Sequence, residues 1–450
     1  MGKKEQILDK LMAIKAEGGC HRCGTCVGVC PSAALGIDSD CYPQIKDRSA
    51  CIGCGKCLKV CPSSDFDCNA FTQKKHEYDF NLTHGFFDSA ILAHATNKVI
   101  RETGSSGGFV TQILLSLLNS GEIDGALVVG NRENEEQIWS GKPQIARTAD
   151  QIIAAAQSKY TIASTNSVLS EIIKVDGRYA AVGLPCQIQG IKKAISLDKR
   201  LAERIVLTIG LFCHSTLTPE AYKSVWDILK IDEAHRFIPR LGKHPGTPYL
   251  EMINGEKKPL YFPEKKGFRP NSTEMLNVLF RLYTQQRCFL CHDALSEFAD
   301  ISVGDPYLPE PQGVSLKDGW SFALIRSELG RKALDLSLQR GDIVIKELSQ
   351  AEALKCNAVM IREKKDRAYY QIRKNRSVGK FSPIYTQSET DIPCLNRTQK
   401  IKVKLNLLSH WFCVRPAGRD RALRFFLGNV GYQFLKLNHY RKTFVKKFKR

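Results

Sequence analysis

The sequence CHRCGTCVGVCP at residues 20–31 is repeated as CIGCGKCLKVCP at residues 51–62. Each copy has the spacing Cys-x-x-Cys-x-x-Cys-x-x-x-Cys followed by proline, the pattern of bacterial ferredoxin domains with two 4Fe–4S clusters. Three closely spaced thiolates can hold one face of an iron–sulfur cube, while the fourth cysteine reaches the cube held by the other copy. The spacing therefore predicts two ligand sets, which are Cys20, Cys23, Cys26 and Cys61 for one cluster and Cys51, Cys54, Cys57 and Cys30 for the other.

Zinc and disulfides are the two alternative uses of these cysteines. Structural zinc sites take four ligands in two separated pairs, whereas each copy here has an extra cysteine and a trailing proline. Disulfides fit less well, because the chain has 17 cysteines, an odd number. The first residues are charged and polar and do not resemble a secretory signal. We therefore expect a reducing, cytoplasmic location.

The length of 450 residues is far more than a ferredoxin domain needs and predicts several domains. The longest apolar stretches, such as residues 205–213, are about half as long as a membrane-spanning helix requires, so we expect no transmembrane segment. We predict a lead helix at residues 1–19, a ferredoxin domain at 20–78, an α/β domain at 85–395 with parts at 85–165 and 166–395, and a basic tail at 396–450.

Short apolar runs alternate with amphipathic stretches through the middle of the chain, which is typical of an α/β domain with a largely parallel sheet. The predicted strands are residues 125–130, 178–185, 204–213, 300–305 and 321–326. The predicted helices are residues 109–118, 168–174, 188–194 and 219–229. The segment 237–270 is dense in Gly, Pro and Lys and predicts a hairpin and surface loops. Cys41 and Cys68 lie outside both cysteine runs, and we interpret them as buried thiols.

Two short motifs are candidate cofactor contacts. TGSSGG at residues 103–108 leads into a predicted helix, and a glycine-rich helix N-terminus offers free backbone N–H groups to a phosphate. A plain turn is the alternative. In SKY at residues 158–160, a cation stands between two hydroxyl groups. A lysine near a flavin can stabilise the reduced ring, which makes Lys159 a candidate catalytic residue; a solvated surface triplet is the alternative.

Four further cysteines lie at predicted strand ends or in a tight pair: Cys186, Cys213, Cys288 and Cys291. The carboxyl ends of strands in an open sheet are where ligands gather, and four thiolates are enough for a third cluster. Two alternatives stay open. The two isolated cysteines can be small buried hydrophobic residues, and the Cys-x-x-Cys pair can be a redox or zinc pair. Spacing alone does not favour the cluster.

The order of the motifs TGSSGG, SKY, GLPCQIQG, LFCHS, RCFLCHDALSEFADISVGD and DGWSFALIRS resembles the beta-subunit family of deazaflavin coenzyme (F-420) hydrogenases and dehydrogenases. The resemblance covers roughly residues 86–349. It implies an FAD-binding α/β domain with its own 4Fe–4S cluster. The ligands it implies are Cys186, Cys213, Cys288 and Cys291, and the flavin contacts it implies are Gly104, Ser105, Ser106, Gly107, Gly108, Ser158, Lys159 and Tyr160.

The expected fold is therefore an α+β ferredoxin-like domain with two 4Fe–4S clusters, an α/β flavin-binding domain and a basic helical tail. The expected function is an iron–sulfur flavoprotein oxidoreductase that passes electrons between a ferredoxin-like carrier, three clusters and FAD, to or from a substrate or deazaflavin-type coenzyme. Clusters carry one electron at a time, so two-electron chemistry needs a flavin as converter. The alternatives are a non-catalytic electron-transfer subunit of a larger complex and a reductase or accessory protein of surface-polysaccharide synthesis.

The net charge of +20 is concentrated in the tail, where residues 397–450 hold fifteen Lys or Arg and one acid, Asp420. Apolar and basic residues are interleaved from residue 421 to 450, as in helices that lie in a membrane interface. An anionic membrane surface is thus a candidate partner, with a peripheral position on the inner face. The alternatives are packing of the tail on the body and nucleic-acid binding. Nucleic-acid binding is the less favoured of the two, because nothing else in the chain resembles a base-reading module.

Overall fold

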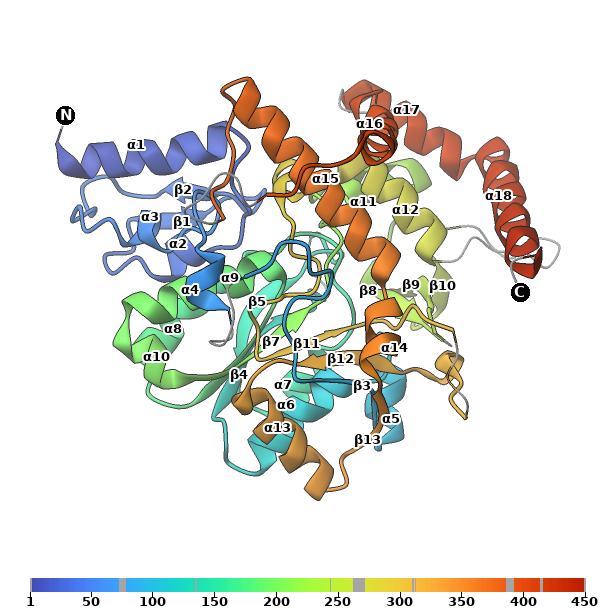
Figure 1. Ribbon diagram of the computed structural model, residues 1–450, viewed down its shortest axis with the longest axis horizontal. Helices are drawn as coiled ribbons and strands as arrows, with labels where there is room; N and C mark the ends of the chain where they lie inside the picture. The colour runs from blue at the N-terminus through green and yellow to red at the C-terminus, as the bar shows by residue number, and fades with distance from the viewer. Residues whose placement is uncertain are drawn as a thin grey trace.

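The computed structural model describes residues 2–72, 78–133, 136–242, 244–261, 272–309, 311, 313–385, 392–412 and 416–448. Figure 1 shows the N-terminal region packed on one side of a central α/β body, with the C-terminal helices on the other side. The cysteine-rich region begins with helix α1 (Lys3–Ala16), where the sequence predicted a lead helix. Its other elements are short: α2 (Thr25–Gly28), β1 (Leu35–Ile37), β2 (Pro43–Ile45), α3 (Lys56–Lys59) and α4 (Cys68–Phe71).

The body is built on an eight-stranded sheet. The strands run in the spatial order β13 (Ile343–Leu348), β3 (Ser89–Ala95), β12 (Ser321–Ile325), β11 (Ile301–Gly304), β7 (Ile205–Leu211), β6 (Tyr179–Gly183), β4 (Gly125–Gly130) and β5 (Lys142–Ala146). Only the central strands β11, β7, β6 and β4 pair in parallel, and the strands on both sides of them pair antiparallel. The prediction of a largely parallel sheet is therefore wrong, and the sheet is mixed.

The five predicted strands are β4, β6, β7, β11 and β12, and three strands were not predicted: β3, β5 and β13. All three unpredicted strands belong to the antiparallel parts of the sheet. Strand β13 lies at the edge of the sheet, and its sequence IVIKEL mixes apolar and polar residues without a strict alternation. Such a pattern resembles a loop or a short helix at the sequence level.

Alternate side chains of the sheet point to two different cores. On one face, Ala126 and Val128 of β4 pack with helices α6 (Phe109–Asn119) and α13 (Glu328–Gln339). On the other face, Leu127 packs in a cluster with helices α8 (Leu169–Lys174) and α9 (Pro185–Leu197). This alternation is the two-residue period of a strand. The second cluster also contains Val29, Val60 and Phe66, so the cysteine-rich region shares a continuous apolar core with the body.

A three-stranded antiparallel sheet, β8 (Ala234–Leu241), β9 (Thr247–Met252) and β10 (Lys257–Pro259), forms where the sequence predicted a hairpin and surface loops. Residues 262–270 of that prediction lie outside the described residues. The sheet packs with α11 (Glu220–Leu229) and α12 (Ser272–Tyr283). Shorter helices connect the elements of the body: α5 (Lys98–Thr103), α7 (Ala149–Ala154), α10 (Lys199–Arg204), α14 (Gln350–Lys355), η1 (Thr165–Val168), η2 (Gln286–Leu290) and η3 (Leu316–Asp318).

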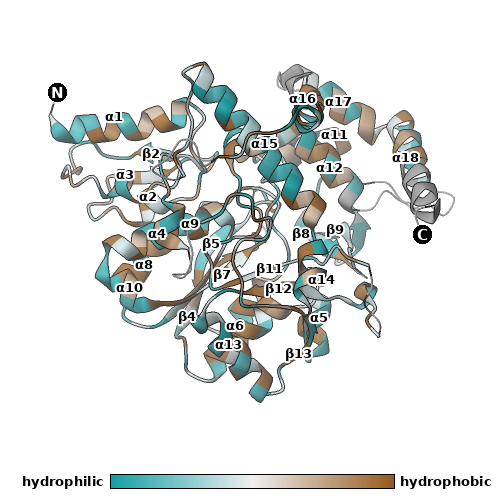
Figure 2. Cartoon of the chain, in the orientation of Figure 1, coloured by the Kyte–Doolittle hydropathy of each residue, from teal (hydrophilic) through white to brown (hydrophobic). Residues whose placement is uncertain are grey.

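Four longer helices follow the sheet in the sequence: α15 (Ala358–Ser377), α16 (Arg397–Phe412), α17 (Pro416–Leu427) and α18 (Asn429–Phe448). Figure 2 shows polar and apolar residues interspersed along α16, α17 and α18. Within the described part of the chain, no helix combines the length and the hydropathy needed to cross a membrane.

Candidate functional site

The first predicted ligand set is brought together in the cysteine-rich region. Burial raises the pKa of Cys20 to about 12, and the neighbouring thiolates of Cys23 and Cys61 act in the same direction. Burial also raises the pKa of Cys26, with further contributions from Cys23, Cys61 and Cys20. Without a metal these thiols would stay protonated, and the closely spaced thiolates would be stable only beside a positive charge such as that of bound iron. The fourth cysteine of the second run therefore lies with the first run, as the spacing predicts.

The second predicted set is centred on Cys57. Burial raises the pKa of Cys57 to about 11, and Cys30, Cys54 and Cys51 add to this increase. Cys57 also acts on the first set, because it contributes to the raised pKa of Cys26. The two sets are therefore neighbours. Cys68 lies outside both sets and is fully buried, as predicted, whereas Cys41 is only half-buried and does not match its interpretation as a buried thiol.

Tertiary structure also brings together the four cysteines of the body, hereafter the third cysteine group. Burial raises the pKa of Cys186 well above its usual range, and Cys23, Cys291, Cys213 and Cys288 add to this. Cys186 lies in the first turn of α9, Cys213 follows β7, and Cys288 lies in η2. The thiols thus come from three separate segments that meet at the carboxyl ends of the central strands, where an open sheet gathers ligands.

Buried donors surround the third cysteine group. Arg287 is 1% exposed, and within the described residues neither its Nε nor its Nη1 atom has a hydrogen-bond partner. The Nε atom of Arg367 and the Nε2 atom of the buried His21 are in the same situation. Unpaired buried donors are costly, and the sulfurs of an iron–sulfur cube would accept from them. The residues present therefore fit a 4Fe–4S cluster.

The geometry differs from that of a mononuclear metal site. In the described part of the chain, no three Cys, His, Asp or Glu side chains converge closely enough to hold a single metal ion. A cube spreads its four thiolates over four iron corners, so it does not require such convergence.

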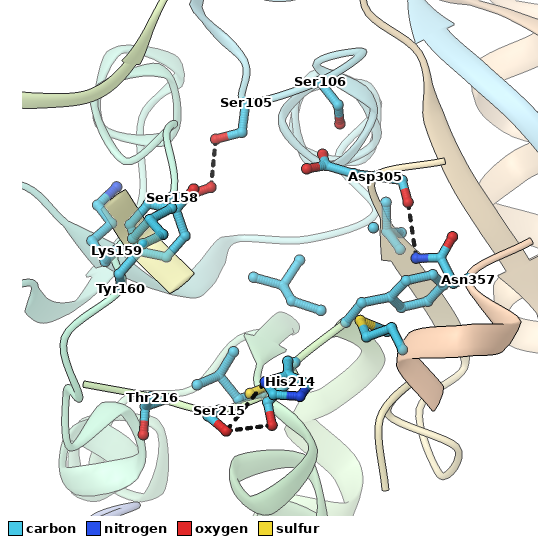
Figure 3. Close-up of a pocket in the computed structure, with 18 of the residues that line it drawn as sticks. Ser105, Ser106, Ser158, Lys159, Tyr160, His214, Ser215, Thr216, Asp305 and Asn357 are labelled. Carbon is cyan, nitrogen blue, oxygen red and sulfur yellow. Dashed lines mark hydrogen bonds between the residues drawn. The ribbon is translucent and has the colours of Figure 1, made fainter. Parts of the chain in front are cut away.

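A cavity of about 1180 Å³ lies beside the third cysteine group. Its wall includes the N-terminus of α6, residues that follow β7 and β11, and side chains of α12, α15 and α16. Figure 3 shows Ser105, His214 and Asp305 around this cavity. Ligand pockets usually have volumes of about 300–1,000 Å³, so this cavity is large enough for an extended dinucleotide. Cys213 and Phe289 line the cavity, and Cys213 also belongs to the third cysteine group.

The TGSSGG motif forms the wall of the cavity at α6. Gly104, Ser105, Ser106 and Gly108 line the cavity, whereas Gly107 does not. Gly108 is the N-cap of α6, with φ of 69° and no side-chain cap, so the first backbone N–H groups of the helix are left for a ligand.

Packing explains the two final glycines of this motif. A Cβ atom on Gly107 would lie 2.4 Å from the carbonyl oxygen of Ala93, and one on Gly108 would lie 2.4 Å from that of Ile100. Both glycines therefore allow the chain to pass close to its own backbone, and their absence of a side chain does not by itself indicate a phosphate site.

The SKY motif lies across the cavity from α6. Ser158 Oγ donates a hydrogen bond of 2.8 Å to Ser105 Oγ, which joins the two motifs (Figure 3). Lys159 also lines the cavity, but its ammonium group donates to the carbonyl oxygens of Ala155 and Ala156, both at 2.6 Å. Burial lowers the pKa of Lys159 to about 7, and Arg236 contributes further. The side chain thus caps the end of α7, a structural task that the sequence did not reveal.

Several lining residues were missed at the sequence level. His214, Ser215 and Thr216 follow Cys213 along the cavity wall, and Asp305 follows β11. Burial, and then the charges of Arg367 and Lys364, lower the pKa of His214 well below its usual range, so its imidazole is neutral. One feature of the sequence pointed to these residues: they directly follow predicted strands, and ligands gather at strand ends.

Comparisons with known proteins agree with this layout. Residues 90–170 match the N-terminal model of the family described as "Coenzyme F420 hydrogenase/dehydrogenase, beta subunit", and residues 176–351 match the C-terminal model of the same family. Residues 10–65 match the "4Fe-4S dicluster domain". The chain is 27% identical to a "Coenzyme F420 hydrogenase subunit beta" of Methanococcus voltae, over 66% of this chain and 98% of that protein.

The chain is also 28% identical to a "Coenzyme F420-dependent sulfite reductase" of Methanocaldococcus jannaschii, over 77% of this chain. It spans only half the length of that relative. Among solved structures, a chain of the F420-reducing NiFe hydrogenase complex from Methanosarcina barkeri has the same fold, with a TM-score of 0.52 and 23% identity over 68% of this chain and 98% of that one.

Proposed function

Because the chain belongs to the coenzyme F420 hydrogenase/dehydrogenase beta-subunit family and carries an N-terminal 4Fe–4S dicluster domain, we propose that it is an iron–sulfur flavoprotein oxidoreductase. In this proposal, the third cysteine group holds a third 4Fe–4S cluster and the cavity holds FAD. Electrons pass between a ferredoxin-like carrier protein or a small redox coenzyme and a substrate at the cavity.

The observation that carries the proposal is the double position of Cys213, which belongs to the third cysteine group and also lines the cavity. A group bound by Cys213 would therefore lie next to a cofactor bound in the cavity. The other end of the third cysteine group supports the same route, because Cys186 interacts with Cys23 of the first set. Cys26 of that set interacts in turn with Cys57 of the second set. The three groups thus form a row that ends at the cavity.

The cavity residues have separate tasks in this proposal. The uncapped N-terminus of α6 would hold a pyrophosphate through its backbone N–H groups and its positive dipole end. Ser105 and Ser158 would add hydroxyl donors beside it. A flavin, when bound, supplies the exchange between one-electron and two-electron chemistry. Lys159, which we predicted as a catalytic residue, would place a charge at the cavity wall only in its protonated form.

The composition of the reconstituted protein tests this proposal. Anaerobic reconstitution is expected to give about twelve iron and twelve sulfide per chain, three cubes of four each, together with one FAD. Replacing Cys288 and Cys291 by alanine should remove about four iron and leave the signals of the dicluster domain. Reduction with candidate donors, followed at flavin and cluster wavelengths separately, tests the route. An unmodified protein with about eight iron, or without bound FAD, contradicts it.

A second candidate is an electron-transfer subunit of a larger complex, favoured by the names of the relatives, several of which are subunits. The two candidates differ in one measurement. An enzyme in its own right turns over a two-electron substrate when supplied with reduced carrier, whereas a relay subunit becomes reduced but turns over only after its partner subunits are added.

A further inference from the structure

Helices α17 and α18 each present one apolar face to the body. Leu423 and Leu427 of α17 and Leu435 of α18 are buried in the same apolar cluster as α11 and α12. Arg419 supports this contact through an ion pair of 3.0 Å with Glu220 of α11. These residues therefore pack on the body, as one of the alternatives for the tail predicts.

The same two helices carry a second apolar face that points away from the body. Val430, Phe434 and Leu437 of α18 are 68%, 54% and 69% exposed, and Phe425 of α17 is 46% exposed. Positions 430, 434 and 437 have the i, i+4, i+7 spacing of a single helix face. Leu435 and Tyr432 lie on the opposite face and are buried. The outward residues are therefore an additional stripe, which packing on the body does not explain.

Helix α16 repeats this two-faced pattern. Ile401, Leu405 and Leu408 are 50%, 61% and 47% exposed, again with i, i+4, i+7 spacing, while Val403 between them is buried. Helices α16 and α18 thus each expose an apolar stripe, and α17 between them exposes Phe425. Isolated exposed apolar residues are normal on a protein surface, but aligned ones indicate an interaction site.

Positive charge accompanies the outward stripes. Residues 397–450 hold fifteen Lys or Arg and one acid. Arg421 and Arg424 are exposed beside Phe425, and Lys400 and Lys404 are exposed around the stripe of α16. Apolar residues that insert between lipids, flanked by cations that attract anionic headgroups, are the composition of an interfacial helix.

We propose that the exposed apolar residues of α16–α18 dock the chain on an anionic lipid surface. These residues are Ile401, Leu405, Leu408, Phe425, Val430, Phe434 and Leu437. Charge complementarity favours lipid over a second copy of this chain, since two such basic faces would repel each other.

Docking through these helices would also bring the cavity close to the lipid. Lys402, Val403, Asn406 and Leu407 of α16 line the cavity. The outward stripe of α16 is therefore separated from the cavity by about one helix diameter, roughly 10 Å. A redox partner held at the same surface would find the cavity within reach.

Co-sedimentation of the reconstituted full chain with vesicles tests the proposal. We expect binding to vesicles that contain phosphatidylglycerol, little binding to pure phosphatidylcholine, and release by salt, which screens the charges. The triple variant Val430→Ser, Phe434→Ser and Leu437→Ser should bind anionic vesicles at least about tenfold more weakly. A matched control is Val99→Ser, Ile253→Ser and Val378→Ser, which removes residues of similar exposure outside the tail and should leave binding unchanged.

Iron content and circular dichroism verify that each variant is folded. The proposal is overturned by equal binding of the outward variant and its control, by equal binding to neutral and anionic vesicles, or by the absence of binding. A dimer in analytical ultracentrifugation that the outward variant disrupts would overturn it as well, because the stripe would then be an interface between copies.

Discussion

The ammonium group of Lys364 lies 2.6 Å from the carbonyl oxygen of Cys213 and donates a hydrogen bond to it. A second bond, of 2.7 Å, joins the same ammonium group to the carbonyl oxygen of Asp293. Lys364 is 1% exposed and belongs to α15, beyond the residues that match the family. It therefore fixes two segments of the third cysteine group and places a buried positive charge beside them.

Replacing Lys364 by methionine should weaken the fold and lower the reduction potential of the proposed third cluster. Two buried carbonyl groups lose their donor, at a cost of about 1–3 kcal/mol each. A cation that favours the more negative, reduced state is also lost. Thermal unfolding and an electron paramagnetic resonance titration would measure the two effects. The control Lys374→Met alters an exposed lysine of the same helix and should change neither the thermal unfolding nor the reduction potential. If Lys364→Met has the same reduction potential as the unmodified protein, the electrostatic role is refuted.

Removal of Lys159 should affect stability in a pH-dependent manner. The folded chain lowers the pKa of this lysine to about 7, against about 10.4 for an unfolded chain. Between these values the unfolded state binds more protons, so the stability of the unmodified protein should rise with pH relative to Lys159→Met. Below pH 7 both states are protonated and the difference should be flat. Anaerobic melting temperatures at pH 6.5, 8 and 9.5 would show this.

The opposite result has a clear meaning. A difference between the two proteins that stays constant up to pH 9.5 would indicate that the carbonyl oxygens of Ala155 and Ala156 keep the ammonium group charged.

Replacing Ser105 by aspartate should abolish the proposed FAD binding while the clusters remain. Ser105 lines the cavity just before the N-terminus of α6. A carboxylate there is compatible with the helix dipole, but it repels a pyrophosphate. Ser105→Ala loses only the hydrogen bond with Ser158 and should retain FAD. The amount of flavin that acid releases from each variant gives the FAD occupancy. Full FAD content in Ser105→Asp would show that the pyrophosphate does not bind at the N-terminus of α6. This pair is a sharper test than a larger residue at Gly108, whose contact with Ile100 would distort the backbone itself.

Asn166→Ala should loosen the junction between the dicluster domain and the body. The buried amide of Asn166 donates to Thr25 Oγ1 at 2.8 Å and to the carbonyl oxygen of Gln187 at 2.9 Å. Its backbone N–H donates to the carbonyl oxygen of Cys23 at 2.9 Å. We expect a loss of about 1–3 kcal/mol of stability and slower reduction of the proposed third cluster in stopped-flow experiments. The control is Asn131→Ala, which removes an exposed amide that donates to Ala154. Equal reduction rates in the unmodified protein, Asn166→Ala and Asn131→Ala would exclude a role of the junction in electron transfer.

The sequence by itself determined that the chain begins with a 4Fe–4S dicluster domain, because the cysteines lie within two short runs of one spacing. The division of these cysteines into two ligand sets stays a prediction of that spacing. The sequence also determined the strands and helices of the parallel centre, whose continuous apolar runs have few interpretations. The antiparallel edge strand β13 was not predicted, since its apolar and polar residues do not alternate with the two-residue period of a strand.

Only the tertiary structure decided that Cys186, Cys213, Cys288 and Cys291 meet, since the strand order of the sheet brings residues about a hundred positions apart to one edge. It also decided that Lys159 faces the end of α7 and that Lys364 supports the third cysteine group. Side-chain direction and burial depend on neighbours that are remote in the chain. Local spacing does not contain that information.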